Sequence, residues 1–165
     1  HIILYKTHRN TRRYMEVIKS KISTKGRYGL RAIVELAVSS VNQQVPLNTI
    51  AENQNISVSY LEQLFSMLRK AGLVKSIKGA QGGYILGDEP RNITVGKVLR
   101  TLEGDLSVID ESNNENNDCM QYCIRENVWD KINSCIDKVV DSITLEDLVD
   151  DYHRLKGSDN YMYYI

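Results

Sequence analysis

The clearest chemical potential in this chain lies in the polar side chains of residues 57–70. An apolar set, Leu61, Leu64, Phe65 and Leu68, recurs there at helical spacing, with hydroxyl, carboxylate and amide groups between its members. A helix with one buried face can offer such polar groups to base edges, and basic residues at its end suit phosphate. The pattern predicts a nucleic-acid reading helix. Its polar candidates are Ser57, Ser59, Tyr60, Glu62, Gln63, Ser66, Arg69 and Lys70.

A basic, Gly-rich segment at residues 78–83 is the second such feature. It reads Lys-Gly-Ala-Gln-Gly-Gly and lies between two β-prone runs, 73–77 and 84–86. This order predicts a hairpin whose glycines supply positive φ angles and let the backbone approach a groove closely. The candidate contacts are Lys78, Gly79 and Gln81 on the hairpin, with Lys25, Arg27 and Arg31 at the start of the first helix as phosphate contacts.

The elements that must position these groups follow from spacing and turn residues. A first helix is predicted at residues 25–40, and Pro46 begins a short second helix that ends at the turn-formers 53–55. In the third helix, Ser57 and Ser59 are N-cap candidates, and Ser59 with Glu62 matches a capping box. Gly72 is predicted to end that helix. The order indicates a mainly α fold with a small β-hairpin wing, a winged helix-turn-helix.

The second half of the chain is predicted to form an arm. Thr94 caps a fourth helix that ends near Gly104, and the Asp/Glu/Asn-rich stretch at 107–118 indicates a mobile loop. A fifth helix has a wide apolar face that predicts a subunit seam, and a sixth begins at Thr144. The predicted seam residues are Val128, Trp129, Ile132, Ile136, Val139 and Ile143. The predicted domains are an N-terminal extension (1–20), a winged helix-turn-helix (21–104), a mobile loop (105–122), and the dimerisation helix, sixth helix and tail (123–165).

Charge and composition narrow the function classes. Residues 1–100 hold 16 Lys/Arg against 6 Asp/Glu, whereas residues 101–165 hold 5 against 15. A basic half favours a polyanionic partner, with nucleic acid as the first expectation and anionic lipid as the alternative. No apolar run approaches the roughly 20 residues of a membrane span, so we expect a cytoplasmic protein with no membrane partner. No catalytic triad, phosphate loop or metal-spaced His pair is present, so an enzyme is not expected.

The three cysteines do not indicate a disulfide framework, because their number is odd. Cys135 lies on the apolar stripe of the fifth helix and is predicted to be a small core residue. Cys119 and Cys123, four residues apart, are either ordinary exposed thiols, a metal-binding pair, or a pair that forms a strained disulfide under oxidants. DNA binding requires no cofactor in any of these cases.

Four motifs carry a family resemblance. Lys21-Ile-Ser-Thr-Lys-Gly-Arg-Tyr-Gly-Leu, Ile56-Ser-Val-Ser-Tyr-Leu-Glu-Gln-Leu-Phe, Gly72-Leu-Val and Lys78-Gly-Ala-Gln-Gly-Gly-Tyr resemble the Rrf2 (Rrf-two) family of winged-helix regulators over roughly residues 21–165. The resemblance implies a homodimer joined through the fifth helix that binds double-stranded DNA at a palindromic operator. The stretch Thr144-Leu-Glu-Asp-Leu and the final Tyr-Met-Tyr-Tyr-Ile are most similar to family members that repress cysteine-metabolism genes.

Other family members bind an iron–sulfur cluster, and the resemblance implies where one would lie. Those members have three cysteines about six residues apart and a nearby His. Cys123 matches the last of these cysteines and Glu126 falls at the His position, whereas Cys119 is only four residues upstream. The metal candidates are therefore Cys119, Cys123 and Glu126, in a pattern that departs from the family's. A repressor of cysteine or sulfur metabolism genes is the predicted function, and a cluster- or thiol-based redox sensor is the alternative.

The terminal residues 161–165 are the last candidate site. Five bulky residues after the hinge at 157–160 indicate an end that docks, either on its own dimer or on a partner. The resemblance to cysteine-metabolism repressors implies cysteine synthase, an enzyme that binds the C-terminal Ile of serine acetyltransferase in its active site. Tyr164 and Ile165 are the residues expected to enter that pocket.

Overall fold

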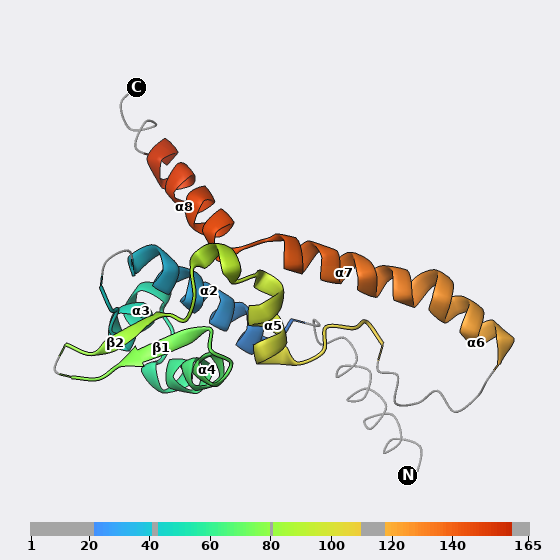
Figure 1. Cartoon of the computed structure of the whole chain (residues 1–165), viewed down its shortest axis with the longest axis horizontal. Coiled ribbons are helices and arrows are strands. Elements are labelled where there is room, and N and C mark those ends of the chain that lie inside the picture. The colour runs from blue at the N-terminus through green and yellow to red at the C-terminus, as the bar shows by residue number, and fades with distance from the viewer. Residues whose placement is uncertain (1–21, 41–42, 80, 110–117, 160–165) are drawn as a thin grey trace, which may run out of the picture.

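A computed structural model describes residues 22–40, 43–79, 81–109 and 118–159 (Figure 1). The predicted extension at 1–20 and the tail residues Tyr164 and Ile165 lie outside the described residues. The elements are α2 (Thr24–Ser39), α3 (Leu47–Gln54), α4 (Val58–Lys70), β1 (Val74–Ile77), β2 (Gly83–Leu86), η1 (Pro90–Asn92), α5 (Val95–Glu103), α6 (Cys119–Ile124), the π-helical η3 (Arg125–Trp129), α7 (Asp130–Ser142) and α8 (Leu145–Asp159).

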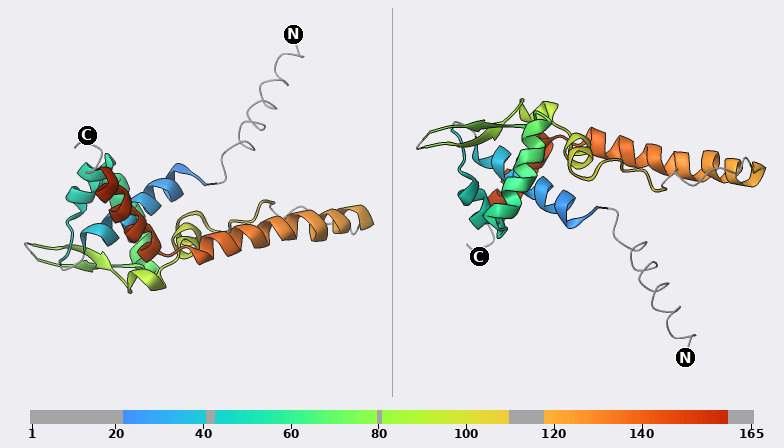
Figure 2. Two further views of the ribbon diagram at one scale, coloured as in Figure 1. Left: turned by 90° about the horizontal axis from the view of Figure 1, so that it is seen from above. Right: turned by 90° about the horizontal axis from the view of Figure 1, so that it is seen from below.

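Two parts make up the molecule. Helices α2 to α5 and the hairpin form a compact body, and α6, η3 and α7 form one long helical arm that projects from it (Figures 1 and 2). Helix α8 returns to pack on α2. The predicted winged-helix fold is confirmed. None of the helices among the described residues is both long enough and apolar enough to cross a membrane.

The body is built around one apolar core between α2, α3 and α4. Ile33, Leu36, Ile50, Leu61 and Phe65 are fully buried there. Each comes from a helix whose apolar residues recur every three or four positions, so one face of each helix points inward. The core therefore holds α4 by its buried face and leaves the opposite face of this helix in solvent.

The two ends of α4 confirm the predicted N-cap Ser57 and the predicted stop at Gly72, but not the predicted capping box. Ser57 is the N-cap, because its Oγ accepts a hydrogen bond from the N–H of Tyr60 at 3.3 Å. The predicted capping box of Ser59 and Glu62 is wrong, since Ser59 lies inside the helix. At the other end Gly72 has φ +76°, and the N–H of Leu73 donates to the carbonyl of Leu68, as a glycine-terminated helix requires.

The wing is a two-stranded antiparallel hairpin with a third segment beside it. Val74 pairs with Leu86 and Ile77 with Gly83. On the outer side of β2, Val45 and Tyr84 exchange two backbone hydrogen bonds of 2.9 Å. The edge of the short hairpin is therefore held to the segment that leads into α3.

Side-chain caps close the first turns of α5 and α8. Thr94 caps α5, as predicted, and its Oγ1 accepts from the N–H of Lys97 at 3.2 Å. At the start of α8, Thr144 and Asp147 bond reciprocally, with the backbone N–H of Thr144 donating to the carboxylate at 2.8 Å. The backbone N–H of Asp147 donates in turn to Thr144 Oγ1 at 3.1 Å. The backbone N–H of Thr144 and its hydroxyl both donate to the Asp147 carboxylate and lower its pKa, because they stabilise its charged form.

The loop predicted at 105–122 begins where α5 ends, after the C-cap Gly104, but its predicted end is wrong and its first residues are packed. Leu106 is almost fully buried against α5 and α7, so the chain is still packed on the body there. The arm begins at Cys119, with Asp118 as its N-cap, so residues 119–122 are helical. The composition of 107–118 hid this start, because an Asp that caps a helix also resembles a loop residue.

Candidate nucleic-acid interface

Helix α4 presents its polar residues as a single exposed surface. Ser59, Glu62 and Gln63 are exposed in its N-terminal half, and Arg69 and Lys70 are exposed in its last turn. Leu61, Leu64, Phe65 and Leu68, on the opposite face, are buried. These groups suit base edges in different ways. The Glu62 carboxylate can accept a hydrogen bond from cytosine, and the Gln63 amide can form two hydrogen bonds with adenine. The Ser59 hydroxyl can bond to either base.

Tyr60 differs from the other candidates on this helix. Its ring packs edge-on against Tyr28 of α2, with centroids 6.2 Å apart, and the side chain is half-buried. The guanidinium of Arg31 lies over the Tyr28 ring, with its central carbon 5.7 Å from the ring centroid. Tyr60 therefore joins α4 to α2 as well as lying beside the predicted reading surface.

The basic residues at the start of α2 are in different environments. Arg27 is exposed and Lys25 is half-buried. Arg31 is also exposed, but its guanidinium already donates to the side-chain and backbone oxygens of Gln54, both at 3.1 Å. Of the three, Arg27 is the one whose charge is most open to a phosphate.

The N-terminus of α2 is occupied by a side chain that the sequence analysis missed. Glu103 Oε1 accepts from the backbone N–H of Ser23 at 3.1 Å, from its hydroxyl at 2.6 Å, and from the N–H of Gly26 at 2.7 Å. These N–H groups could otherwise bind an anion such as phosphate. The carboxylate comes from the end of α5, 77 residues away from Gly26, so no local spacing could reveal it.

The wing places Lys78, Gly79 and Gln81 at its exposed end. Gly79 has φ +128°, which only glycine adopts readily. The side-chain amide of Gln44 donates to the carbonyl of Gln81 at 2.7 Å. Gln44, another residue that sequence analysis missed, therefore tethers the tip of the wing to the segment before α3.

The predicted role of the last two wing glycines is corrected. Gly82 and Gly83 do not have positive φ angles. They are needed because a Cβ at Gly82 would lie 2.5 Å from the carbonyl oxygen of Ile77, and one at Gly83 would lie 2.6 Å from that of Val45. Their close approach is to the protein's own backbone, and this packing accounts for glycine at both positions.

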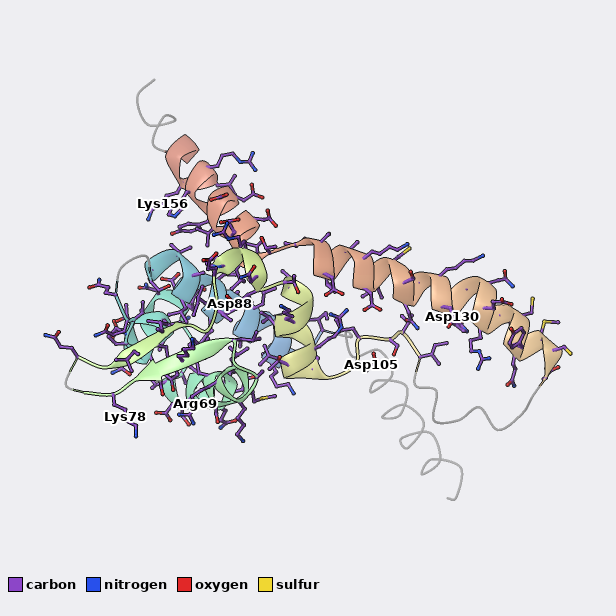
Figure 3. The ribbon with its side chains drawn as sticks, in the orientation of Figure 1. Arg69, Lys78, Asp88, Asp105, Asp130 and Lys156 are labelled. Atoms are coloured by element: carbon purple, nitrogen blue, oxygen red, sulfur yellow. The ribbon has the colours of Figure 1, made fainter. Side chains whose placement is uncertain are left out.

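Helix α4 and the wing share one side of the body. Arg69 at the end of α4 and Lys78 on the wing point to the same edge in Figure 3, whereas Lys156 on α8 lies on the far side. Helix α4 also packs against β1, and Phe65 meets Tyr84 of β2 edge-on at 4.9 Å. The structure thus brings together the α4 and wing candidates from segments that are separate in sequence.

The cysteines do not form a conventional cluster site. All three are exposed, so the prediction that Cys135 is a core residue is wrong for the single chain. Cys135 lies 12 residues after Cys123 on the same helical arm, roughly 18 Å away. Within the described ranges no three His, Cys, Asp or Glu side chains are grouped to hold a metal ion, so Cys119, Cys123 and Glu126 are not brought together. The donor set of one chain does not fit a four-ligand iron–sulfur site.

The apolar face predicted as a seam divides into two adjacent stripes. Ile136 and Ile143 pack with Val140 against Val95 and Leu99 of the same chain's α5. An outer stripe of Val128, Ile132, Cys135 and Val139 is exposed. Trp129 is half-buried beside a cavity of about 250 Å³ at the start of the arm. The seam therefore stays a prediction, and the outer stripe is the part of it that is free in one chain.

Comparisons with known proteins agree with this architecture. The Rrf2 family, described as an iron-dependent transcriptional regulator, matches residues 22–151. The HTH-type transcriptional regulator CymR of Bacillus subtilis is 46% identical over 145 residues, 88% of this chain and 99% of that protein. The HTH-type transcriptional regulator IscR of Vibrio atlanticus is 43% identical over 141 residues, 84% of this chain and 80% of that protein.

A solved structure shows the same likeness in three dimensions. The structure of CymR, called the global cysteine regulator of B. subtilis, has a TM-score of 0.68 and 47% identity to this chain. The match covers 78% of this chain and 95% of the solved one.

Proposed function

Because this chain belongs to the Rrf2 family of transcriptional regulators, we propose that it is a homodimeric repressor that binds a palindromic operator through α4 and the wing. One recognition helix of each subunit enters the major groove of one half-site. The wing and the basic residues of α2 and α4 contact the phosphates beside it.

The observation that carries this proposal is the division of α4 into two faces. Its apolar side chains are buried in the core, and its exposed face carries Ser59, Glu62 and Gln63 followed by Arg69 and Lys70. A helix held rigidly by its back presents these groups in one geometry, which base readout requires. Lys78 on the wing extends the same edge.

A binding experiment with two variants and one control tests the proposal. Specific duplexes are selected from a random library with the full chain, and affinities are measured by fluorescence anisotropy at several salt concentrations. Gln63→Ala should relax discrimination at one base pair by about 1–3 kcal/mol, whereas Lys78→Ala should weaken all duplexes alike and flatten the salt dependence. Lys156→Ala, on the opposite side of the body, should change neither.

Two results would count against this interface. If Gln63→Ala weakens selected and random duplexes equally, α4 is not the reading helix. If Lys156→Ala costs as much as Lys78→Ala, the lysines contribute only net charge. Selection of no specific duplex at all would reject the operator-binding function itself.

We propose cysteine and sulfur metabolism genes as the regulated set. Support comes from the 46% identity to CymR over nearly its whole length, and from the description of that protein as a global cysteine regulator. Mapping of bound promoters in cells grown with and without cysteine tests the assignment. Enrichment of genes for sulfur uptake and cysteine synthesis is expected, and their absence from the bound set would reject it.

The second candidate is a thiol- or cluster-sensing regulator, favoured by the two exposed thiols one helical turn apart, Cys119 and Cys123. A cluster would need ligands beyond these two thiolates and Glu126. Protein purified without oxygen would show visible absorbance if it carries a cluster, and Cys119→Ala/Cys123→Ala would lose it. Colourless wild-type protein whose DNA binding is unchanged by thiol oxidants would reject this candidate.

Cysteine synthase is the proposed protein partner. In a chain that ends at Ile165, a carboxylate beside that branched apolar side chain would be a suitable ligand for a pocket of backbone donors. Calorimetric titration of cysteine synthase with the chain ending at Ile165 should show binding, and a chain ending at Tyr164 should not bind. Equal binding by the two chains would remove Ile165 from the contact.

A further inference from the structure

The joint between the body and the arm contains a fork of charged hydrogen bonds. Arg100 of α5 donates from Nη1 to Asp141 Oδ1 at 2.7 Å and from Nη2 to Asp141 Oδ2 at 3.0 Å. The same Nη2 donates to Asp137 Oδ1 at 2.5 Å. Both acids lie on α7, one turn apart, so one guanidinium binds two successive turns of the arm. A planar guanidinium bonded in this way restricts both the distance and the direction of its partner.

A glycine permits this close contact. Gly96 lies one turn before Arg100 on α5 and is buried. A Cβ at Gly96 would lie 1.9 Å from Asp141 Oδ1 and 2.6 Å from Arg100 Nη1. Any side chain there would displace the carboxylate from the fork. The pattern Gly-x-x-x-Arg on α5 and Asp-x-x-x-Asp on α7 is therefore a matched pair of surfaces.

Other contacts hold the arm near the body but fix its direction less strictly. Val95 and Leu99 pack against Ile136 and Val140, and apolar packing of this kind is not directional. The backbone N–H of Val95 donates to the carbonyl of Ile143 at 2.8 Å, at the point where the arm ends. This bond acts as a pivot at Ile143, whereas the fork engages α7 at Asp141 and Asp137, two and six residues before it, and so reaches about one and two-thirds turns along the arm.

The length of the arm converts a small change in angle into a large displacement. Val128, at the far end of the exposed outer stripe, is 13 residues from Asp141, about 20 Å at 1.5 Å per residue. A tilt of about 10° at the fork would move it by about 3.4 Å, the rise of one base pair along a DNA strand. In a dimer joined by the arms, such a tilt changes the separation of the two α4 helices by a comparable amount.

We propose that Arg100 is a positioning residue that sets the half-site spacing recognised by the dimer. The proposal rests on the proposed function, because it needs two arms that dimerise and two α4 helices that read DNA. Arg100 contacts no base in this scheme. It holds the arm at one angle to the body, so that only one separation of half-sites meets both recognition helices.

The test measures spacing preference rather than affinity alone. The probes are the palindromic duplex selected by the wild-type chain, versions with the spacer changed by one or two base pairs, and a duplex with a single half-site. Wild type should lose about tenfold or more in affinity for each wrong spacer, within the usual range of coupling between sites. Arg100→Gln should reduce this preference to about threefold or less and leave half-site affinity within about twofold.

A partner-side variant separates positioning from charge. Asp137→Asn/Asp141→Asn leaves Arg100 in place and should flatten the spacing profile as Arg100→Gln does. Asp150→Asn/Asp151→Asn on α8 makes the same change in net charge and should keep the wild-type profile. Because these variants alter exposed residues, the partner-side pair remains informative if Arg100→Gln does not fold.

Each outcome decides the matter. A wild-type spacing profile in either fork variant would overturn the proposal, and a flattened profile in Arg100→Gln alone would show that Arg100 acts on DNA directly. Failure of the wild-type chain to select any palindrome would reject the proposed function instead. Flattening in both fork variants but not in the α8 control would establish Arg100 as the spacing determinant.

Discussion

At the scale of single residues, three side chains stabilise the elements that carry the candidate interface. Glu103 closes the N-terminus of α2, Gln44 tethers the wing tip, and Ser57 caps α4. Ser57 is also a DNA-contact candidate, so its structural and functional roles need to be separated. The N–H that it binds belongs to Tyr60, in the first turn of α4.

Because Ser57 caps α4 and Ser59 does not, replacing each by Ala should change the free energy of unfolding by different amounts. Ser57→Ala removes the acceptor for an N-terminal N–H and should lower the free energy of unfolding by about 1 kcal/mol. Ser59→Ala, inside the helix, should change it by less than about 0.5 kcal/mol, because Ala is the better helix former. Urea denaturation of both variants measures the difference. Equal stability of the two variants would mean that the Ser57 hydrogen bond adds nothing to folding.

At the scale of elements, the wing and α4 are packed together as one unit. Phe65 of α4 and Tyr84 of β2 meet edge-on, and Tyr84 is bonded through its backbone to Val45. A change in the wing backbone should therefore reach α4 through packed side chains. The contact explains why a hairpin of two four-residue strands can hold a fixed position beside the helix.

The substitution Gly83→Ala tests whether a change in the wing backbone affects α4. The new Cβ would lie 2.6 Å from the Val45 carbonyl oxygen, and neither segment can move away without breaking the backbone pairing of Val45 with Tyr84. We expect a loss of about 1–3 kcal/mol in unfolding free energy and weaker DNA binding. The control is Gly157→Ala on α8, where nothing lies within 4 Å and the change should be neutral or stabilising. A fully stable Gly83→Ala chain would contradict the close packing.

The two apolar stripes of the arm should respond differently to an introduced charge. Val139 is 58% exposed in one chain, whereas Ile136 packs on α5. Val139→Asp should therefore leave the chain folded and dissociate a dimer formed through the outer stripe, because an unpaired charge in a seam costs several kcal/mol. Ile136→Asp should damage folding itself. Analytical ultracentrifugation should give a mass of 18.9 kDa for Val139→Asp and twice that for Ser134→Asp, on the opposite side of the arm. An intact Val139→Asp dimer would place the interface elsewhere.

At the scale of the whole molecule, the charge is divided between the parts of the fold. The basic residues of α2, α4 and the wing belong to the body, whereas Asp137 and Asp141 on α7 and the acids of α8 belong to the second half of the chain. A divided surface orients a polyanion toward one side during approach. Arg100 is the point at which the two charge regions meet, and both acids raise its pKa by bonding to its charged form.

The fork makes stability depend on pH in a defined direction. Hydrogen bonding to Arg100 lowers the pKa of Asp141 below its ordinary value of 3.8. A group whose pKa is lowered by folding stabilises the protein above its ordinary pKa, and that contribution is lost as pH falls through the lowered pKa. The stability difference between wild type and Arg100→Gln should therefore be constant from about pH 7 to about pH 5 and shrink below about pH 4.

Urea midpoints of the two proteins across this range measure the effect. Asp147 also has a lowered pKa, but its partner is Thr144, so its contribution is present in both proteins and cancels. A stability difference that persists unchanged at the lowest pH would show that Arg100 stabilises the fold without its carboxylate partners.

Local sequence determined much of this protein. The buried stripe of α4, the Gly72 stop, the Thr94 cap and the order of helices and hairpin were all predictable, because each depends on residues within one or two helical turns. The family was predictable from motifs, since they record the same local requirements. The exposed candidates on α4 follow from the same helical period, although their roles in DNA binding remain predictions.

The tertiary structure decided what local sequence could not. Residue spacing alone predicted a single apolar face on the arm, because its two stripes share the helical period. Only the position of α5 shows that Ile136 and Ile143 are already packed against the same chain. Glu103 binds a helix 77 residues away from it, and Gly82 and Gly83 are glycines because of neighbouring backbone. Arg100 and Asp141 are 41 residues apart in the chain. Apart from Gly82, which meets Ile77 within its own hairpin, each deciding contact joins distant segments, so its energy appears only when the chain is folded.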